Sequence, residues 1–99
     1  NKTSVLFSLS FIAFSVFFTL LKDAHFIRAI QADEIAKAWI LEFKDSNEKH
    51  IAVAWSSDAL ANRPMVKLDF EVKTIVDAFG KTIADPAKLL TEPVYYIGK

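Results

Sequence analysis

The sequence predicts an α+β protein, with an N-terminal single transmembrane helix followed by a small antiparallel sheet of about three or four strands covered by helix. Three observations predict this. Residues 5–21 carry no charge, residues 24–37 are rich in helix-forming side chains, and residues 66–73 alternate apolar with charged side chains. We therefore divide the chain into a transmembrane helix or uncleaved signal anchor at 1–22 and a small α+β extramembrane domain at 23–99.

The charge-free run is long enough to suggest a membrane span. Seventeen residues rise roughly 25 Å as a helix, close to the ~30 Å of a bilayer core. Two other interpretations stay open: a signal peptide ending at Ala32, and a buried helix of a soluble protein. The expected location is a bacterial or mitochondrial inner membrane, and the alternative is periplasmic or secreted.

One stripe of the predicted span suits contact with other helices. Small hydroxyl residues four apart fall on one side of a helix, where they allow close approach of a second helix. The proposed helix-packing face comprises Ser4, Ser8, Phe11, Ser15 and Thr19. The alternative is that these hydroxyls bond back to their own helix. The expected partners are other transmembrane helices of a complex, together with the lipid bilayer.

The rest of the chain is predicted as one helix, a hairpin, a third strand, a short helix and a last strand. Residues 39–43 and 51–55 are apolar runs around a polar turn and form the hairpin, although helix could also continue through residue 43. Residues 66–73 form the third strand, and 85–90 form a helix that Asp85 caps.

Residues 94–97 read as the terminal strand of the sheet. Because strand side chains alternate, Tyr95 and Tyr96 point to opposite faces. One of the two rings is therefore expected to contact a partner.

Composition and motifs argue against catalysis. The chain has no Cys and two Gly, which excludes disulfides, thiolate metal sites and Gly-rich phosphate loops. His25 and His50 have no neighbours at metal-ligand spacing, and Asp69 and Glu71 read as a solvated strand face. We therefore expect no catalytic, cofactor-binding or metal-binding residues, no cofactor and no enzymatic activity. The twelve basic residues balance the twelve acidic ones, which argues against nucleic acid as a partner, and no small-molecule substrate is evident.

By elimination, the sequence predicts a non-catalytic, single-pass membrane accessory or structural subunit of a larger membrane protein complex, with a helix-packing face and a small protein-interaction domain. The first alternative is a secreted or periplasmic binding or inhibitory domain whose first 32 or so residues are a signal peptide. The second is a filament subunit, since helix followed by sheet is similar to the layout of pilin-like proteins. Val5 departs from the Glu that those proteins have near their start.

Overall fold

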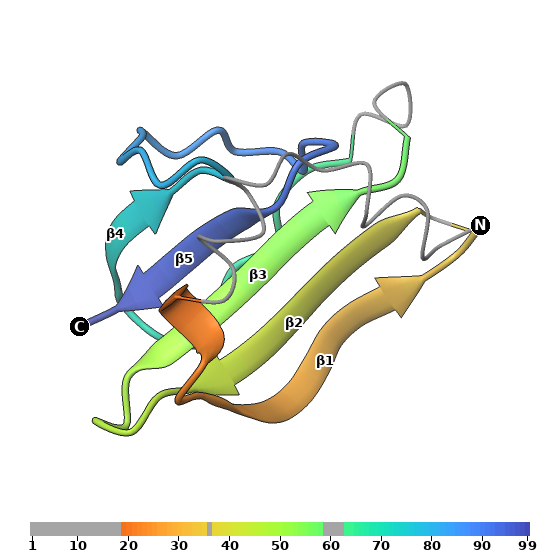
Figure 1. Cartoon of the computed structure of the whole chain (residues 1–99). Coiled ribbons are helices and arrows are strands. Elements are labelled where there is room, and N and C mark those ends of the chain that lie inside the picture. Colours follow the sequence, from red (N-terminus) through yellow and green to blue (C-terminus); the bar gives the residue numbers. More distant parts are fainter. Residues whose placement is uncertain (1–18, 36, 59–62) are drawn as a thin grey trace.

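The computed structural model describes residues 19–35, 37–58 and 63–99, and these residues form one five-stranded antiparallel sheet (Figure 1). The strands are β1 (His25–Asp33), β2 (Ala38–Lys44), β3 (His50–Ser56), β4 (Val72–Val76) and β5 (Val94–Gly98). Their order across the sheet is β1-β2-β3-β5-β4. All four neighbouring pairs are antiparallel, so β5 returns between β3 and β4.

The predicted α+β class is wrong. The described chain is 47% strand and 4% helical, and its helix is a single turn at residues 19–21. Apart from this turn, no helix lies on the sheet in the described ranges. The prediction of a transmembrane helix is corrected as well, since no helix among the described residues is long and apolar enough to cross a membrane. Residues 5–18 of the predicted span lie outside the described residues, and Leu20 and Leu21 pack against the sheet.

The segment predicted as the connecting helix is the edge strand β1. Its side chains are good helix formers, but helix propensity is worth only tenths of a kcal/mol per residue and tertiary pairing overrides it. β1 pairs with β2 from His25 opposite Lys44 to Asp33 opposite Ala38. A signal peptide ending at Ala32 would remove nearly all of this strand.

The hairpin prediction is confirmed by β2 and β3, which pair in continuous register from Ala38 opposite Ser56 to Lys44 opposite His50. The turn between them is built on Asp45. Its carboxylate accepts hydrogen bonds from the backbone N–H groups of Asn47 and Lys49, at 2.8 and 2.9 Å. This is the local bonding for which Asp is favoured in turns.

Two other predicted elements fail for related reasons. Residues 66–71 alternate as a strand would, but they cross the sheet face without joining the ladder, and pairing begins only at Val72. An extended chain with one side packed shows the same alternation as a strand. At 85–90, Asp85 accepts a 2.8 Å hydrogen bond from Ala87 N–H, and Ala87 has φ 61°, so a turn forms where a helix was expected.

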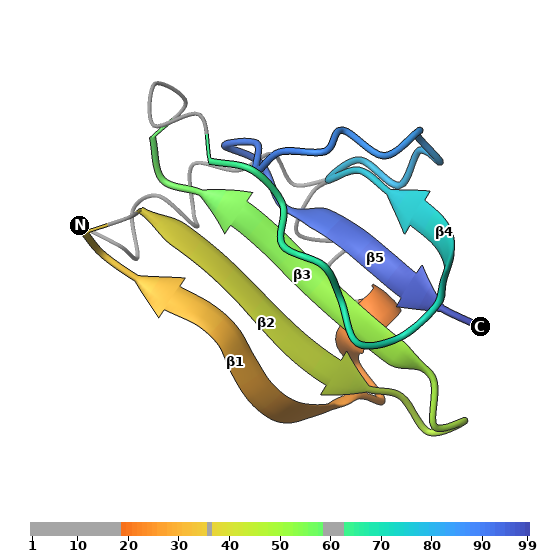
Figure 2. The ribbon, with the colours of Figure 1, turned by 180° about the vertical axis from the view of Figure 1, so that it is seen from behind.

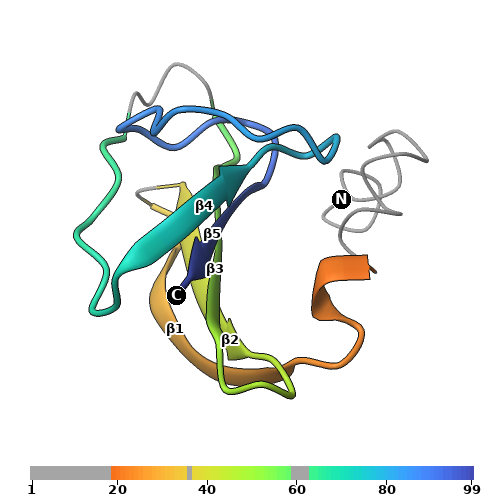
Figure 3. The same ribbon diagram turned by 90° about the vertical axis from the view of Figure 1, so that its left-hand side faces the viewer.

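The sheet has two packed faces. The rear face, seen in Figure 2, is crossed by residues 63–71, and the front face, seen in Figure 1, carries the helical turn. Figure 3 shows the sheet between these two coverings. The buried residues of the rear face are Ala38, Ile40, Ala52, Ala54, Leu89, Val94 and Tyr96, and those of the front face are Leu21, Ile51, Val53 and Tyr95.

Candidate functional site

The two edge strands of the sheet, β4 and β1, differ in whether another segment of the chain pairs with them. Beyond β4, the chain folds back so that Val76 bridges Thr82 and Ile83 N–H donates to the carbonyl of Ile75 at 2.9 Å. Beyond β1, no strand of the described chain follows. Since an unpaired strand edge is a natural place for contact with another molecule, β1 is the first candidate for a binding site.

A β-bulge at Ile27 determines on which face of the sheet the side chains of β1 lie. Phe26 lies opposite Phe43 and Arg28 lies opposite Glu42, so Ile27 is an extra residue with no partner on β2. Without it, strand alternation would place Phe26 and Arg28 on the same face. With it, Phe26 faces front and Arg28 faces rear. The bulge therefore re-aims Arg28 toward Glu42, as bulges commonly do beside functional groups.

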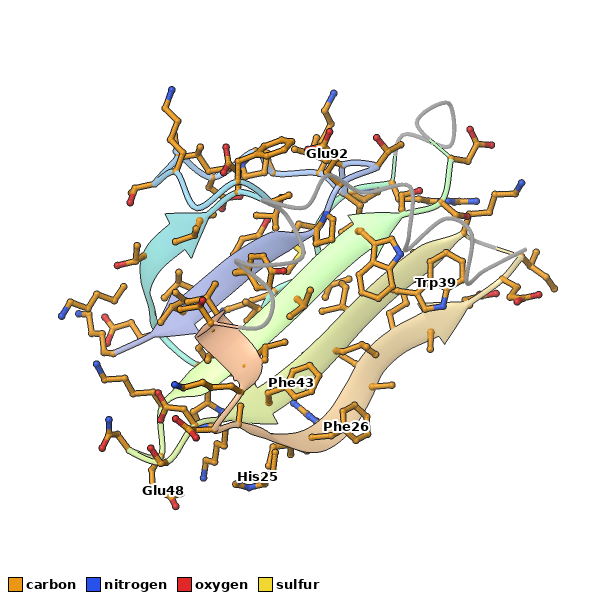
Figure 4. The ribbon with its side chains drawn as sticks, in the orientation of Figure 1. His25, Phe26, Trp39, Phe43, Glu48 and Glu92 are labelled. Atoms are coloured by element: carbon orange, nitrogen blue, oxygen red, sulfur yellow. The ribbon has the colours of Figure 1, made fainter. Side chains whose placement is uncertain are left out.

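Large apolar side chains are exposed along this edge. Phe26 is 55% exposed, Ile27 is 42% exposed, and Ile35, in the turn after β1, is 91% exposed. Of the five exposed large apolar residues in the described part of the chain, three therefore belong to β1 and its turn. Phe26 also packs edge-on against Phe43, with ring centroids 5.6 Å apart (Figure 4). We call Phe26, Ile27 and Phe43 the edge patch.

Behind the edge patch lies a charged cluster on the rear face, formed by Arg28, Glu42, His50 and Asp69. Glu42 is only 1% exposed. Its Oε1 accepts from Arg28 Nε at 2.9 Å, and its Oε2 accepts from Nδ1 of His50. Arg28 also donates through its second arm to Asp69. The cluster thus joins β1, β2, β3 and the 63–71 segment through one buried carboxylate.

The electrostatics of the cluster favour an ionised Glu42. Burial raises the pKa of Glu42, but hydrogen bonds from Arg28 and His50 and the charge of the guanidinium outweigh burial, so its pKa lies below the ordinary value. The hydrogen bond to Glu42 and the charge of Asp69 raise the pKa of Arg28. A buried carboxylate is tolerated only when paired in this way.

The buried polar groups of this cluster are paired with one another. Both carboxylate oxygens of Glu42 and one ring nitrogen of His50 are already engaged within the protein. Within 19–35, 37–58 and 63–99, no three His, Cys, Asp or Glu side chains come together in a way that could hold a metal ion.

The residues singled out from sequence fall elsewhere. Ser4, Ser8, Phe11 and Ser15 of the predicted helix-packing face lie outside the described residues, and Thr19 is exposed in the helical turn. Tyr95 and Tyr96 point to opposite faces as expected, but both are buried, at 1% and 2% exposure. Neither ring is offered to a partner in the described structure.

Sequence reasoning missed the charged cluster, although one signal was present. Glu42 interrupts an apolar run, and strand alternation places it on the same side as Ala38 and Ile40. A charge on the buried side of a strand requires partners. The partners Arg28 and Asp69 could not be found from spacing, because they lie on other segments.

The chain matches no protein-family model, no curated protein and no solved structure. What the site does must follow from its own geometry.

Proposed function

We propose that this protein is a non-catalytic accessory subunit that binds a partner protein through the edge patch at the start of β1. The observation that carries the proposal is the concentration of exposed large apolar side chains on the sheet edge formed by β1, which pairs only with β2 in the described chain. Apolar side chains at such a place are typical of a protein contact. The predicted location at an inner membrane stays a prediction.

The bulges of β1 define the mode of binding. Pairing with β2 shifts register at Ile27 and again between Ala29 and Gln31, so the ladder of β1 is irregular twice within nine residues. Irregular edges hinder the addition of a further strand. Binding through the side chains of Phe26 and Ile27, inserted into an apolar pocket of the partner, fits this edge better than strand addition.

The charged cluster supports the non-catalytic part of the proposal. Its carboxylate is saturated by protein donors, and the cluster fixes Arg28 directly beside the bulge. Its contribution is to hold the edge in the shape that presents Ile27.

The test is site-specific photocrosslinking in cells that express the chain. A photoreactive phenylalanine analogue replaces Ile27 in one variant and Lys73 in the other. Lys73 is a matched control, since it is the bulge residue of β4 and is also exposed. We expect one adduct of defined mass from position 27 that is absent from position 73, with the same partner peptide in repeated digests.

The proposal also predicts that the adduct depends on its neighbour. Adding Phe26→Ser to the position 27 variant should remove the adduct, because half of the apolar contact is lost. Equal adducts from positions 27 and 73, or none from position 27, would contradict the proposal.

A further inference from the structure

Residues 66–71, here called the strap, cover the rear face without belonging to the sheet. Leu68 and Phe70 pack against the buried residues of that face. Phe70 lies so close to β5 that a Cβ added at Gly98 would stand 3.0 Å from its ring. Its other contact is with His50, whose ring stacks on Phe70 with centroids 5.0 Å apart and planes 16° apart.

Backbone hydrogen bonds hold only the two ends of the strap. Before it, Met65 N–H donates to the carbonyl of Ala87 at 3.1 Å, and at its end the carbonyl of Glu71 accepts from Lys99 N–H at 3.2 Å. Between these points, no backbone hydrogen bond joins residues 66–70 to the rest of the described chain. The middle of the strap therefore depends on side-chain contacts, which makes it a segment of low local stability.

Two of these side-chain contacts converge on Glu42. The strap's Asp69 pairs with Arg28, and Phe70 stacks on His50. Both receiving side chains are held by the Glu42 carboxylate, one on each oxygen. Losing the charge of Glu42 would weaken its contacts with Arg28 and His50 together.

We propose that the cluster of Arg28, Glu42, His50 and Asp69 is an acid-sensitive switch that holds the strap on the rear face at neutral pH and releases it when Glu42 is protonated. Release would uncover the apolar surface beneath Leu68 and Phe70. The inference goes beyond the proposed function and needs no partner.

The charges around Glu42 explain why acid would act here. It faces Arg28 from β1 and His50 from β3, while Asp69 of the strap reaches it through Arg28. From β5 the titratable group on this face is Tyr96, which is neutral below a pKa of about 12. Protonation of Glu42 would remove the buried counter-charge that faces the guanidinium of Arg28.

The sign of the pH dependence follows from the folded-state pKa of Glu42, which is lowered. Such a group stabilises the fold above the pKa of the unfolded chain, and this stabilisation is lost as the pH falls through the folded pKa. The strap contacts should therefore weaken on the acid side of the ordinary glutamate value.

Limited proteolysis at neutral pH tests the switch without acid. Trypsin cleavage after the exposed Lys67 reports release of the strap. We expect Glu42→Gln to speed this cleavage by about tenfold or more and Asp69→Asn by a few fold, since the second removes only an exposed pair. The matched control Glu71→Gln, which breaks the exposed Glu71–Lys99 pair on the same strap, should leave the rate unchanged.

The stacked Trp39–Trp55 pair on the front face reports global folding through near-ultraviolet circular dichroism. That signal should persist when cleavage speeds up. If Glu42→Gln unfolds the protein, the Asp69→Asn variant tests the switch in its place. An unchanged rate of trypsin cleavage in Asp69→Asn would overturn the proposal.

In wild type, an acid titration followed by NMR should lose the Phe70–Gly98 contact at a higher pH than the tryptophan signal. Loss of the Phe70–Gly98 contact and of the tryptophan signal at the same pH would also overturn the proposed switch.

Discussion

The two edges of the sheet have different roles in this small domain, one in stability and the other in binding a partner. At β4 the chain returns to pair with the end of the strand at Ile75 and Val76, and Ile75 packs against the rear core. At β1 the edge has no strand beyond it in the described structure, and Ile27 is 42% exposed. Both edges carry a bulge, but only the bulge of β1 exposes a large apolar side chain. β4 therefore stabilises the fold, whereas β1 is available for binding.

The largest effect that separates the edges should be on stability. Ile75→Ala deletes methyl groups that pack on the core and should lower the free energy of unfolding by about 2 kcal/mol. Ile27→Ala deletes exposed methyl groups and should change it by less than about 0.5 kcal/mol. Urea unfolding followed by tryptophan fluorescence measures both. Similar losses at the two positions would show that β1 is as much a part of the core as β4.

A smaller effect is expected at Tyr96, which joins the covered edge to the centre because it lies opposite Ile75 on β4 and Ala52 on β3. Its hydroxyl is buried and accepts or donates no hydrogen bond within the described chain. Tyr96→Phe removes this unsatisfied group and should raise the free energy of unfolding by about 1 kcal/mol. A loss of stability in this variant would mean that the hydroxyl has a partner.

The same tyrosine gives an alkaline prediction. Burial and the nearby charge of Asp85 raise the pKa of Tyr96 from 10 to about 12. Because the unfolded chain ionises first, wild type should lose stability as the pH rises from 10 to 12, and Tyr96→Phe should lose less. Urea midpoints across that pH range measure the difference. Part of the loss should remain in the variant, since burial raises the pKa of Tyr95 as well.

Sequence patterns predicted the elements that depend on interactions between residues close together in the chain. The apolar runs of β2 and β3 around a polar Asp-containing turn predicted the hairpin correctly, and the apolar run at 94–97 corresponds to β5. The alternation at 66–73 predicted a third strand, but only Val72 and Lys73 of this segment belong to one, which is β4. The pattern could not tell whether the segment pairs in the sheet or crosses its face, because side-chain alternation is the same in both cases.

Long-range pairing set the limits of prediction. The helix-forming residues of 24–37 gave no sign that β2 would supply a partner, so β1 was assigned to the wrong class of structure. The bulge at Ile27 is likewise invisible in the sequence, since it exists only relative to β2. For the candidate site, strand periodicity was enough to predict that Glu42 faces inward. The contacts of Arg28 and Asp69 could be found only from the three-dimensional structure.

Binding of alanine variants to the crosslinked partner tests most directly whether the edge patch of β1 binds that partner. Phe26→Ala and Ile27→Ala should each weaken binding by about tenfold or more, because residues central to an interface dominate its affinity. Val66→Ala and Phe79→Ala are matched controls, since both residues are exposed apolar side chains away from β1, and they should change the Kd by less than about twofold. Equal weakening by all four variants, or none by the first two, would contradict the account.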